Sequence, residues 1–197
     1  MKCLKLLVFF LYWISIPDLC QSQDEFAGPY RIALYQYEQC PDGGTNQVYA
    51  NSTRITKVSR IKYLYSSDIT TDVVVDDGVT IVLDVAKFGN GGWKPNFMNL
   101  EFPGFCTSIK QMMPITYDAI MDSLHTRCPI QPGTYQMVDF DTASIKVASS
   151  VPNFPYGKYR ADTILKINST VIGCFRDYVD VIPDRRAQRQ KKPKKNS

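Results

Sequence analysis

From Lys158 to Ile167, mostly charged side chains alternate with mostly apolar ones, one residue at a time. The first set is Lys158, Arg160, Asp162, Ile164 and Lys166, and the second is Tyr159, Ala161, Thr163, Leu165 and Ile167. Because successive side chains of a β-strand point to opposite faces, this pattern predicts a strand with one face in solvent and the other packed.

The residues around this strand predict an antiparallel hairpin. Pro155 and Gly157 favour a turn before it, since proline fixes φ and glycine tolerates positive φ. Asn168 and Ser169 then predict the hairpin tip, and the segment Thr170–Val181 predicts a returning strand with less regular alternation. The hairpin is therefore expected to be half-buried.

A second hairpin is predicted near the middle of the chain. The tripeptide at residues 76–78, Asp-Asp-Gly, is a strong turn signal between Val73–Val75 and Val79–Lys87. In the second of these strands, Val79, Ile81, Leu83 and Val85 would share one face.

Other strand signals are weaker. The segment Arg54–Tyr65 is rich in β-branched and aromatic residues, but it alternates too poorly for its faces to be assigned. Glycine, asparagine and proline in residues 90–96 predict a long loop before a strand at Met98–Phe102. A short strand is predicted at Ser144–Val147.

One segment has helical periodicity. It follows Pro114, and its apolar side chains fall at positions i, i+3, i+4 and i+7. These side chains are Tyr117, Ile120, Met121 and Leu124. Met112 and Met113 precede them, and this group of methionines is interpreted either as ordinary core or as the flexible lining of a pocket for an apolar guest.

Many short strands with turn signals and one helix indicate the fold class. We expect an all-β domain with one short helix, built as a two-sheet antiparallel β-sandwich or β-cup. The expected organisation is a signal peptide over residues 1–22, one domain over residues 23–183 and a disordered basic tail over residues 184–197.

The N-terminus has the pattern of a secretory signal. Lys2 and Lys5 precede the apolar run Leu6–Ile16, which is shorter than the roughly 20 residues that a membrane-spanning helix needs. The small residues Cys20 and Ser22 suit the −3 and −1 positions of a cleavage site after residue 22. The alternative is an uncleaved anchor, which the short apolar run disfavours.

Export determines how the cysteines are interpreted. The chain has 6 cysteines, of which Cys3 and Cys20 would leave with the signal. Those that remain are Cys40, Cys106, Cys128 and Cys174. In an oxidising compartment an even number predicts two disulfides, and three pairings are open. Zinc binding is the alternative, but the chain has no close Cys-x-x-Cys pair and a single histidine, His125.

Two further signals concern the surface. Asn51 and Asn168 each begin an Asn-x-Ser/Thr sequence and are predicted glycosylation sites if exposed. The net charge of +4 comes from a tail rich in lysine and arginine. We expect the tail to be a disordered, solvated end, and the alternatives are contact with anionic lipid headgroups or trimming at Arg186-x-x-Arg189. Nucleic acid is not expected as a partner of an exported chain.

Three stretches carry a resemblance to a known family. They are "YQYEQC" at residues 35–40, "CPIQPGTYQM" at 128–137 and "FPYGKYRADTILKINSTVIGCF" at 154–175. Their order and spacing resemble the ganglioside activator protein and related lipid-recognition proteins, over residues 30–181. Within that group the chain looks most similar to the insect secreted chemosensory protein B set.

The resemblance implies a β-cup that encloses an apolar cavity and has no catalytic machinery or cofactor. It also implies a Cys40–Cys174 bond between the first strand and the last hairpin, and a Cys106–Cys128 bond around the helix. The activator protein has more cysteines than this chain, so its glycolipid specificity is not carried over.

The expected function is that of a secreted, non-enzymatic protein that carries or presents a lipid or another long-chain apolar molecule, in pheromone or gustatory perception. Partners would be the apolar ligand and a membrane surface or the ectodomain of a membrane receptor or channel. The predicted cavity lining is Ile81, Leu83, Val85, Met112, Met113, Ile120, Met121, Leu124, Tyr159, Leu165 and Ile167. Trp93 and Phe97 are predicted at the rim, and plain core is the alternative for all of these residues.

Two other function classes were weighed. A small hydrolase would need a base for its nucleophile, and His125 is the sole imidazole, with Cys106 as its candidate thiol. His125 is expected instead at the end of the helix. A protein-binding module without a ligand is the remaining alternative, and uptake of an apolar probe would separate it from a carrier.

Overall fold

The computed structural model describes residues 27–59, 62–146 and 153–185, and most of them form antiparallel β-strands. The larger sheet has five strands. In spatial order they are β2 (Tyr30–Gln39), β10 (Thr170–Pro183), β9 (Gly157–Ile167), β5 (Val79–Gly89) and β6 (Gly92–Phe102). The predicted all-β class with two antiparallel layers is confirmed.

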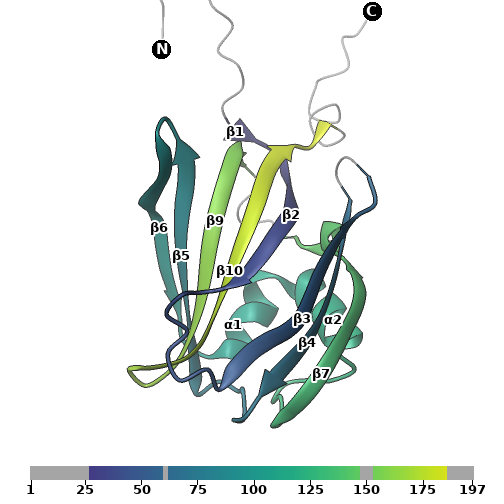
Figure 1. The fold of residues 1–197 in the computed structure, drawn as a ribbon, viewed down its shortest axis with the longest axis vertical. Coiled ribbons are helices and arrows are strands. Elements are labelled where there is room, and N and C mark those ends of the chain that lie inside the picture. The colour runs from purple at the N-terminus through teal and green to yellow at the C-terminus, as the bar shows by residue number, and fades with distance from the viewer. Residues whose placement is uncertain (1–26, 60–61, 147–152, 186–197) are drawn as a thin grey trace, which may run out of the picture.

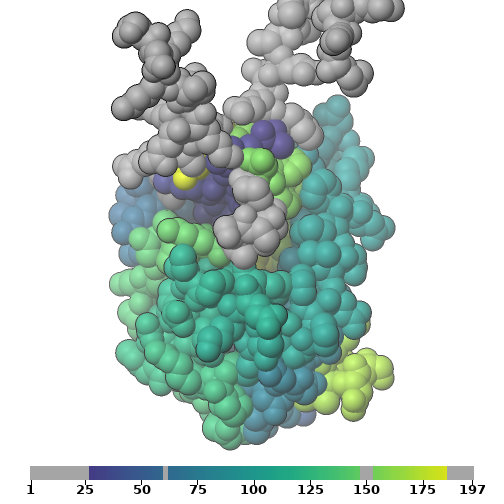
Figure 2. All heavy atoms as spheres, turned by 180° about the vertical axis from the view of Figure 1, so that it is seen from behind, coloured from purple at the N-terminus to yellow at the C-terminus, as the bar shows by residue number. Residues whose placement is uncertain are grey.

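The second layer is a three-stranded sheet, on the right in Figure 1. Its strands are β3 (Val48–Lys57), β4 (Tyr63–Thr71) and β7 (Gly133–Asp141). The short strands β1 (Ala27–Gly28) and β8 (Phe154–Pro155) pair with each other. Two helices, α1 (Phe105–Met112) and α2 (Pro114–Ser123), lie behind the sheets in this view and form part of the nearer face when the molecule is seen from behind (Figure 2).

The last hairpin forms as predicted. Strands β9 and β10 pair antiparallel on either side of the turn at residues 168–169. The apolar set of the alternation faces inward, since Tyr159 and Leu165 are each only 2% exposed. The predicted strand and its face assignment therefore hold.

The outer face of this hairpin is less exposed to solvent than the alternation predicts, because its charged side chains pair with one another. Arg176 on β10 donates two hydrogen bonds to the Asp162 carboxylate on β9, at 2.7 and 2.6 Å. Glu38 on β2 accepts a 2.6 Å hydrogen bond from the Tyr178 hydroxyl and lies 3.7 Å from Arg176. Hydrogen bonding to Asp162 raises the pKa of Arg176 above its ordinary value. A paired network of charges therefore ties three strands together across this face.

Of the hairpin predicted around residues 76–78, the turn and the second strand are confirmed, but the first strand is wrong. Val79 does begin strand β5, but the segment before the turn pairs elsewhere: Val75 forms an isolated bridge with Ile130. The Asp77 carboxylate instead accepts hydrogen bonds from the backbone N–H and the hydroxyl of Thr107, at 2.8 and 2.6 Å. Those bonds lower the pKa of Asp77. The turn thus secures the start of helix α1, which sequence periodicity did not predict.

Three other strand predictions need correction. The glycines after Asn90 make a tight turn, and the residues from Gly92 already belong to strand β6. Pro95 is tolerated in it because β6 is an edge strand, where a missing N–H donor breaks no ladder. The segment Arg54–Tyr65 spans the end of β3 and the start of β4. Within the predicted strand Ser144–Val147, Ser144 ends a 3₁₀ turn, and Val147 lies outside the described residues.

The predicted helix is confirmed as α2, and a second helix precedes it. Proline at the first position of α2 suits a helix start, because the N–H it lacks would have no partner there. The α2 side chains Tyr117 and Met121 are buried against both β-strands and helix α1 in the main hydrophobic cluster. The helices thus belong to the core of the two-sheet structure.

Both disulfides predicted from the family resemblance are present. Cys40 at the end of β2 bonds to Cys174 on β10, and Cys106 on α1 bonds to Cys128. Near the first bond, strand β3 comes so close to β10 that a Cβ at Gly173 would clash with the carbonyl oxygen of Val48. This contact brings the two sheets together at one end of the molecule.

Replacing Gly173 by alanine is expected to lower the free energy of unfolding by about 1 to 3 kcal/mol, because the added methyl group meets backbone rather than a flexible side chain. Gly89→Ala is the matched control, since a Cβ there meets only the side chain of Lys94 at 3.7 Å. Urea unfolding of both variants measures the difference. Equal stability of the two variants would show that β3 and β10 separate at little cost.

The predicted signal peptide, at residues 1–22, and nearly all of the predicted tail, from residue 186 onward, lie outside the described residues. Within the described residues, none of the helices has the length and apolar character required to cross a membrane.

Candidate ligand-binding cavity

A cavity of about 280 Å³, partly open to solvent, lies between the two sheets and helix α2. Ligand sites in proteins typically measure roughly 300 to 1,000 Å³, so this one lies just below the small end of that range. Its lining is almost entirely apolar and comes from both sheets and the helices. The lining residues are Leu34, Tyr37, Val48, Ala50, Tyr65, Ile69, Thr71, Val75, Phe105, Ile120, Met121, Leu124, Ile130, Tyr135, Met137, Phe140, Ile145, Thr163, Leu165, Phe175 and Asp177.

The position of helix α2 explains why a hollow forms here. Met121 packs into a cluster with strands of the larger sheet, whereas Leu124 packs with Tyr65 and Met137 of the smaller sheet. In a simple sandwich the inner faces interdigitate at a spacing of about 10 Å. A helix whose side chains contact both layers, with a diameter of about 10 Å, holds them apart on that side. The space between them is not filled by the side chains present.

Alternation within the strands supplies the walls. On β9 and β10 the inward positions include Thr163, Leu165 and Phe175, which line the cavity. On β4 and β7 the same rule directs Ile69 and Met137 inward. The composition of the cavity walls therefore follows from the two-residue period of the facing strands.

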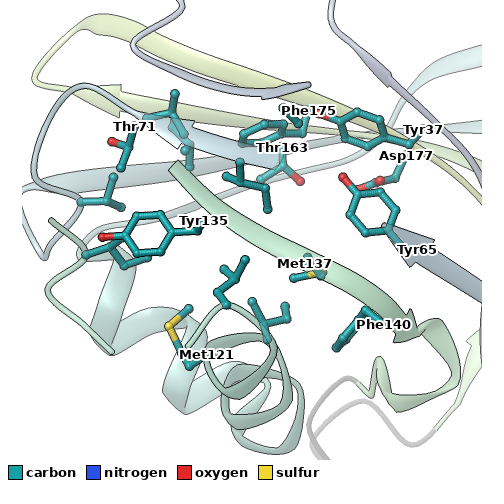
Figure 3. A pocket seen from close by; sticks show the side chains of 18 of the residues that line it. Tyr37, Tyr65, Thr71, Met121, Tyr135, Met137, Phe140, Thr163, Phe175 and Asp177 are labelled. Atoms are coloured by element: carbon teal, nitrogen blue, oxygen red, sulfur yellow. The ribbon is translucent and has the colours of Figure 1, made fainter. Parts of the chain in front are cut away.

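One carboxyl group lines this apolar space. Asp177 lies on β10 between the inward side chains of Phe175 and Val179, and it shares the cavity lining with Tyr37 from β2 and Tyr65 from β4. Figure 3 shows these three at one end of the pocket, with Met121 and Tyr135 farther along it. The rings of Tyr37 and Tyr65 meet edge to face, with their centroids 5.6 Å apart.

The environment of Asp177 disfavours its charge. Removal from water, and to a lesser extent the negative charge of Asp162, raise its pKa from 3.8 to about 7. Burial also raises the pKa of Tyr37 and that of Tyr65, and for Tyr65 hydrogen bonds with Ser67 and Thr53 act in the opposite direction. The cavity therefore has a carboxyl group that titrates near neutral pH.

The other polar groups of the lining divide into satisfied and unsatisfied ones. The Tyr135 hydroxyl donates to the Gln131 carbonyl at 2.7 Å, and the Thr71 hydroxyl donates to the Val73 carbonyl at 2.6 Å. The Tyr37 hydroxyl is buried and has no hydrogen-bond partner among the described residues. The unsatisfied polarity thus gathers at the Asp177 end.

Four of the predicted lining residues do line the cavity. They are Ile120, Met121, Leu124 and Leu165. The others lie elsewhere. Ile81 and Ile167 pack in the main hydrophobic cluster, which also supplies lining residues such as Leu165, but they do not reach the cavity themselves. Leu83, Val85 and Tyr159 pack in a separate cluster with Val181. Met112 and Met113 lie at the junction of the two helices, half-buried and outside the lining.

The reason for these differences is packing along the strands. The inward face of β5 and β9 is longer than the cavity, so part of it meets other side chains directly. At one end Lys87 lies over the rings of Phe97 and Tyr159, 5.6 and 5.7 Å from their centroids. The faces were predictable from alternation, but the places where they face empty space were not.

The two aromatic residues predicted at the rim do not line the cavity. Trp93 packs on Phe88 and, across the outer face of the larger sheet, on Tyr178, with centroids 5.2 and 5.5 Å away. Phe97 packs against Phe154 and Tyr159. Trp93 therefore belongs to an aromatic cluster on the outer face, and Phe97 is a partly exposed residue that packs on the buried ring of Tyr159, because residues 92–102 form an edge strand rather than a loop.

Sequence reasoning missed most of the second wall. The lining residues on β3, β4 and β7 come from segments whose alternation is weak or was not assigned a face. Asp177 was also missed, although a signal existed. On the returning strand it occupies the parity of the inward residue Phe175, so a carboxyl at that position was an exception to the expected apolar face.

The structure also shows where the other residues named in the site predictions lie. Asn51 and Asn168 are exposed, the latter in the β9–β10 turn, and their glycosylation stays a prediction. His125 follows helix α2 and is exposed, while Cys106 is bonded to Cys128. Across the described ranges, no group of three or more His, Cys, Asp or Glu side chains is placed to hold a metal ion.

Comparison with known proteins gives little. No protein-family model matches the chain, and no curated protein matches it. Among solved structures, that of a Niemann-Pick type C2 protein from the Japanese carpenter ant aligns with 73% of this chain and 97% of that chain. The TM-score is 0.34 and the sequence identity 13%, so we carry nothing from that protein to this site.

Proposed function

We propose that this protein is a secreted, non-enzymatic binding protein that carries or presents a lipid or another long-chain apolar ligand. The observation that carries this proposal is the 280 Å³ cavity with its apolar lining from both sheets. Two disulfides are typical of proteins made for an oxidising compartment, which fits export. The resemblance of the sequence motifs to chemosensory protein B adds a role in pheromone or taste perception to the proposal.

The binding mechanism is burial. Each CH₂ group removed from water contributes about 0.8 kcal/mol, so a chain of several carbons gains most of its affinity without any polar contact. The site is already formed between two hydrogen-bonded sheets, so binding requires little ordering of the protein. The ligand would then be held by shape and apolar contact along most of its length.

Filling the cavity tests the proposal. Ile69 lies on the inward face of β4 and lines the cavity. Ile69→Trp is expected to weaken uptake of a fluorescent apolar probe at least tenfold, because the indole occupies the space that the probe needs. Probe titration, together with mass spectrometry of apolar molecules that copurify with native protein, measures the effect.

The control is Val138→Trp, on the neighbouring strand β7 of the same sheet but 69% exposed. It adds the same side chain outside the cavity and is expected to leave uptake unchanged. If the unmodified protein neither takes up the probe nor copurifies with an apolar molecule, the carrier proposal fails. A module that docks on a membrane receptor or channel without a ligand would then be favoured.

A further inference from the structure

The Asp177 carboxyl is not explained by the fold. Its neighbours on the inward face of β10 are Phe175 and Val179, and an aliphatic side chain of similar size would continue that face. Asp177 is half-buried and faces the cavity. A polar group removed from water without a partner destabilises a protein by roughly 1 to 3 kcal/mol, and a charged one by more. Departures of this kind from the expected pattern concentrate at functional sites.

The surroundings of Asp177 offer it no counter-ion. No hydrogen bond or ion pair to its carboxyl is found within the described ranges, and the arginine nearest in sequence, Arg176, points to the opposite face and is bound to Asp162. The unpartnered hydroxyl of Tyr37 lies in the same part of the lining. Two polar groups at one end of an apolar cavity therefore have hydrogen-bonding capacity that the protein does not use.

The hydrogen-bonding chemistry of the Asp177 carboxyl and the Tyr37 hydroxyl limits which ligand groups can pair with them. An ionised carboxylate accepts hydrogen bonds only, whereas its protonated form and the tyrosine hydroxyl can both donate and accept. A hydroxyl group on the ligand can also donate and accept, so it pairs with Asp177 in either protonation state. A pure hydrocarbon leaves both groups unpaired, and a carboxylate ligand brings a second negative charge next to the first.

We propose that the cavity selects an apolar molecule that carries one hydroxyl group, which hydrogen-bonds to Asp177 and Tyr37 while the hydrocarbon part extends toward Met121 and helix α2. This inference rests on the proposed function and specifies the ligand class of the same cavity. A volume of 280 Å³ corresponds to roughly nine groups the size of a water molecule, at about 30 Å³ each, and the cavity is partly open to solvent. A chain of about ten carbons fills it and extends into its opening, so chains of that length are suitable probes.

The test is a competition series of decane, decan-1-ol and decanoic acid against a fluorescent apolar probe, at pH 8. The unmodified protein is expected to bind the alcohol at least tenfold more tightly than the alkane or the acid. Asp177→Leu is expected to lower the preference for the alcohol over the alkane at least threefold without weakening alkane binding, because only Tyr37 remains to bind the hydroxyl. Asp84→Asn, which removes an outward carboxyl from β5 of the same sheet, is the control and is expected to keep the preference.

A second variant protects the test against misfolding. Asp177→Asn retains size and hydrogen bonding but removes the charge, so the alcohol preference over decane is expected to remain while the discrimination against the acid falls at least threefold. Equal binding of decane and decanol by the unmodified protein, or a preference for the alcohol that is undiminished in Asp177→Leu, would overturn this inference and leave the carrier function standing. If the unmodified protein binds none of the three ten-carbon compounds and does not take up the probe, the proposed carrier function itself is wrong.

Discussion

Replacing both Cys40 and Cys174 by alanine is expected to lower the free energy of unfolding by about 5 kcal/mol, which is comparable to the whole stability of many small domains. The bond joins residues 134 apart in sequence, so it removes a large number of conformations from the unfolded chain. It also holds the end of β2 to β10 at the place where β3 meets β10. Without the disulfide, β2 and β10 are held together there by strand pairing alone, next to the place where the two sheets meet.

The second disulfide is the natural comparison. Cys106 and Cys128 are 22 residues apart, and the same loop-entropy relation gives about 3 kcal/mol for their removal. Urea unfolding of the two double-alanine variants measures both losses, with the slope m reporting any change in compactness. A larger loss for the Cys106–Cys128 pair would show that strain or helix docking, rather than loop length, determines the contribution of these bonds.

Asp177→Asn is expected to stabilise the empty protein by an amount that grows with pH. The native pKa of Asp177 is about 7, and the ordinary value, which applies to the unfolded chain, is 3.8. Between these values the native state keeps a proton that the unfolded state has released. The free energy of unfolding of the unmodified protein therefore falls as pH rises from about 4 to about 7, and this contribution is constant at higher pH.

Asparagine carries no such proton. At pH 4 the two proteins should therefore differ little in stability through this group. Above pH 8 the variant should be more stable than the unmodified protein by on the order of 4 kcal/mol, relative to the difference at pH 4. The groups that face Asp177 add no opposing charge in this range: the pKa of Tyr37 and that of Tyr65 are raised by burial, and Asp162 lies across the sheet, paired with Arg176.

Urea unfolding at pH 4, 6 and 8 measures this dependence. Asp84→Asn removes a carboxyl from the outward face of β5 and is expected to leave the pH-dependent contribution of Asp177 in place. Identical pH profiles for Asp177→Asn and the unmodified protein would show that Asp177 is solvated in the native state and does not titrate near pH 7.

Local patterns in the sequence were sufficient for several elements. Two-residue alternation gave both the β9 strand and the face it buries, and the three-to-four-residue spacing of Tyr117, Ile120, Met121 and Leu124 gave helix α2. Each of these signals depends on side chains within a few residues of one another. The disulfide pairing came from the family resemblance, since the spacing of the cysteines left three pairings open.

Signals that depend on distant contacts could not be found in the same way. The turn at residues 76–78 was visible, but that its Asp77 would serve helix α1 depends on a segment 30 residues away. Strand β6 contains a proline and begins at the second of two consecutive glycines, and its place at the edge of the sheet is what tolerates the proline. In the first case a partner distant in sequence decides the outcome, and in the second the position of the strand in the sheet does.

The sequence by itself determined that this chain forms a two-layer antiparallel β-structure with a helix, and which face of its last hairpin is buried. These features follow from periodicity, because the geometry of a strand or a helix fixes where each successive side chain points. The tertiary structure alone decided where the inward faces touch and where they stand apart, and that Asp177 lies at the hollow. A cavity remains where facing side chains do not meet. Its position therefore depends on how helix α2 and both sheets pack together, which the pattern of any one segment does not determine.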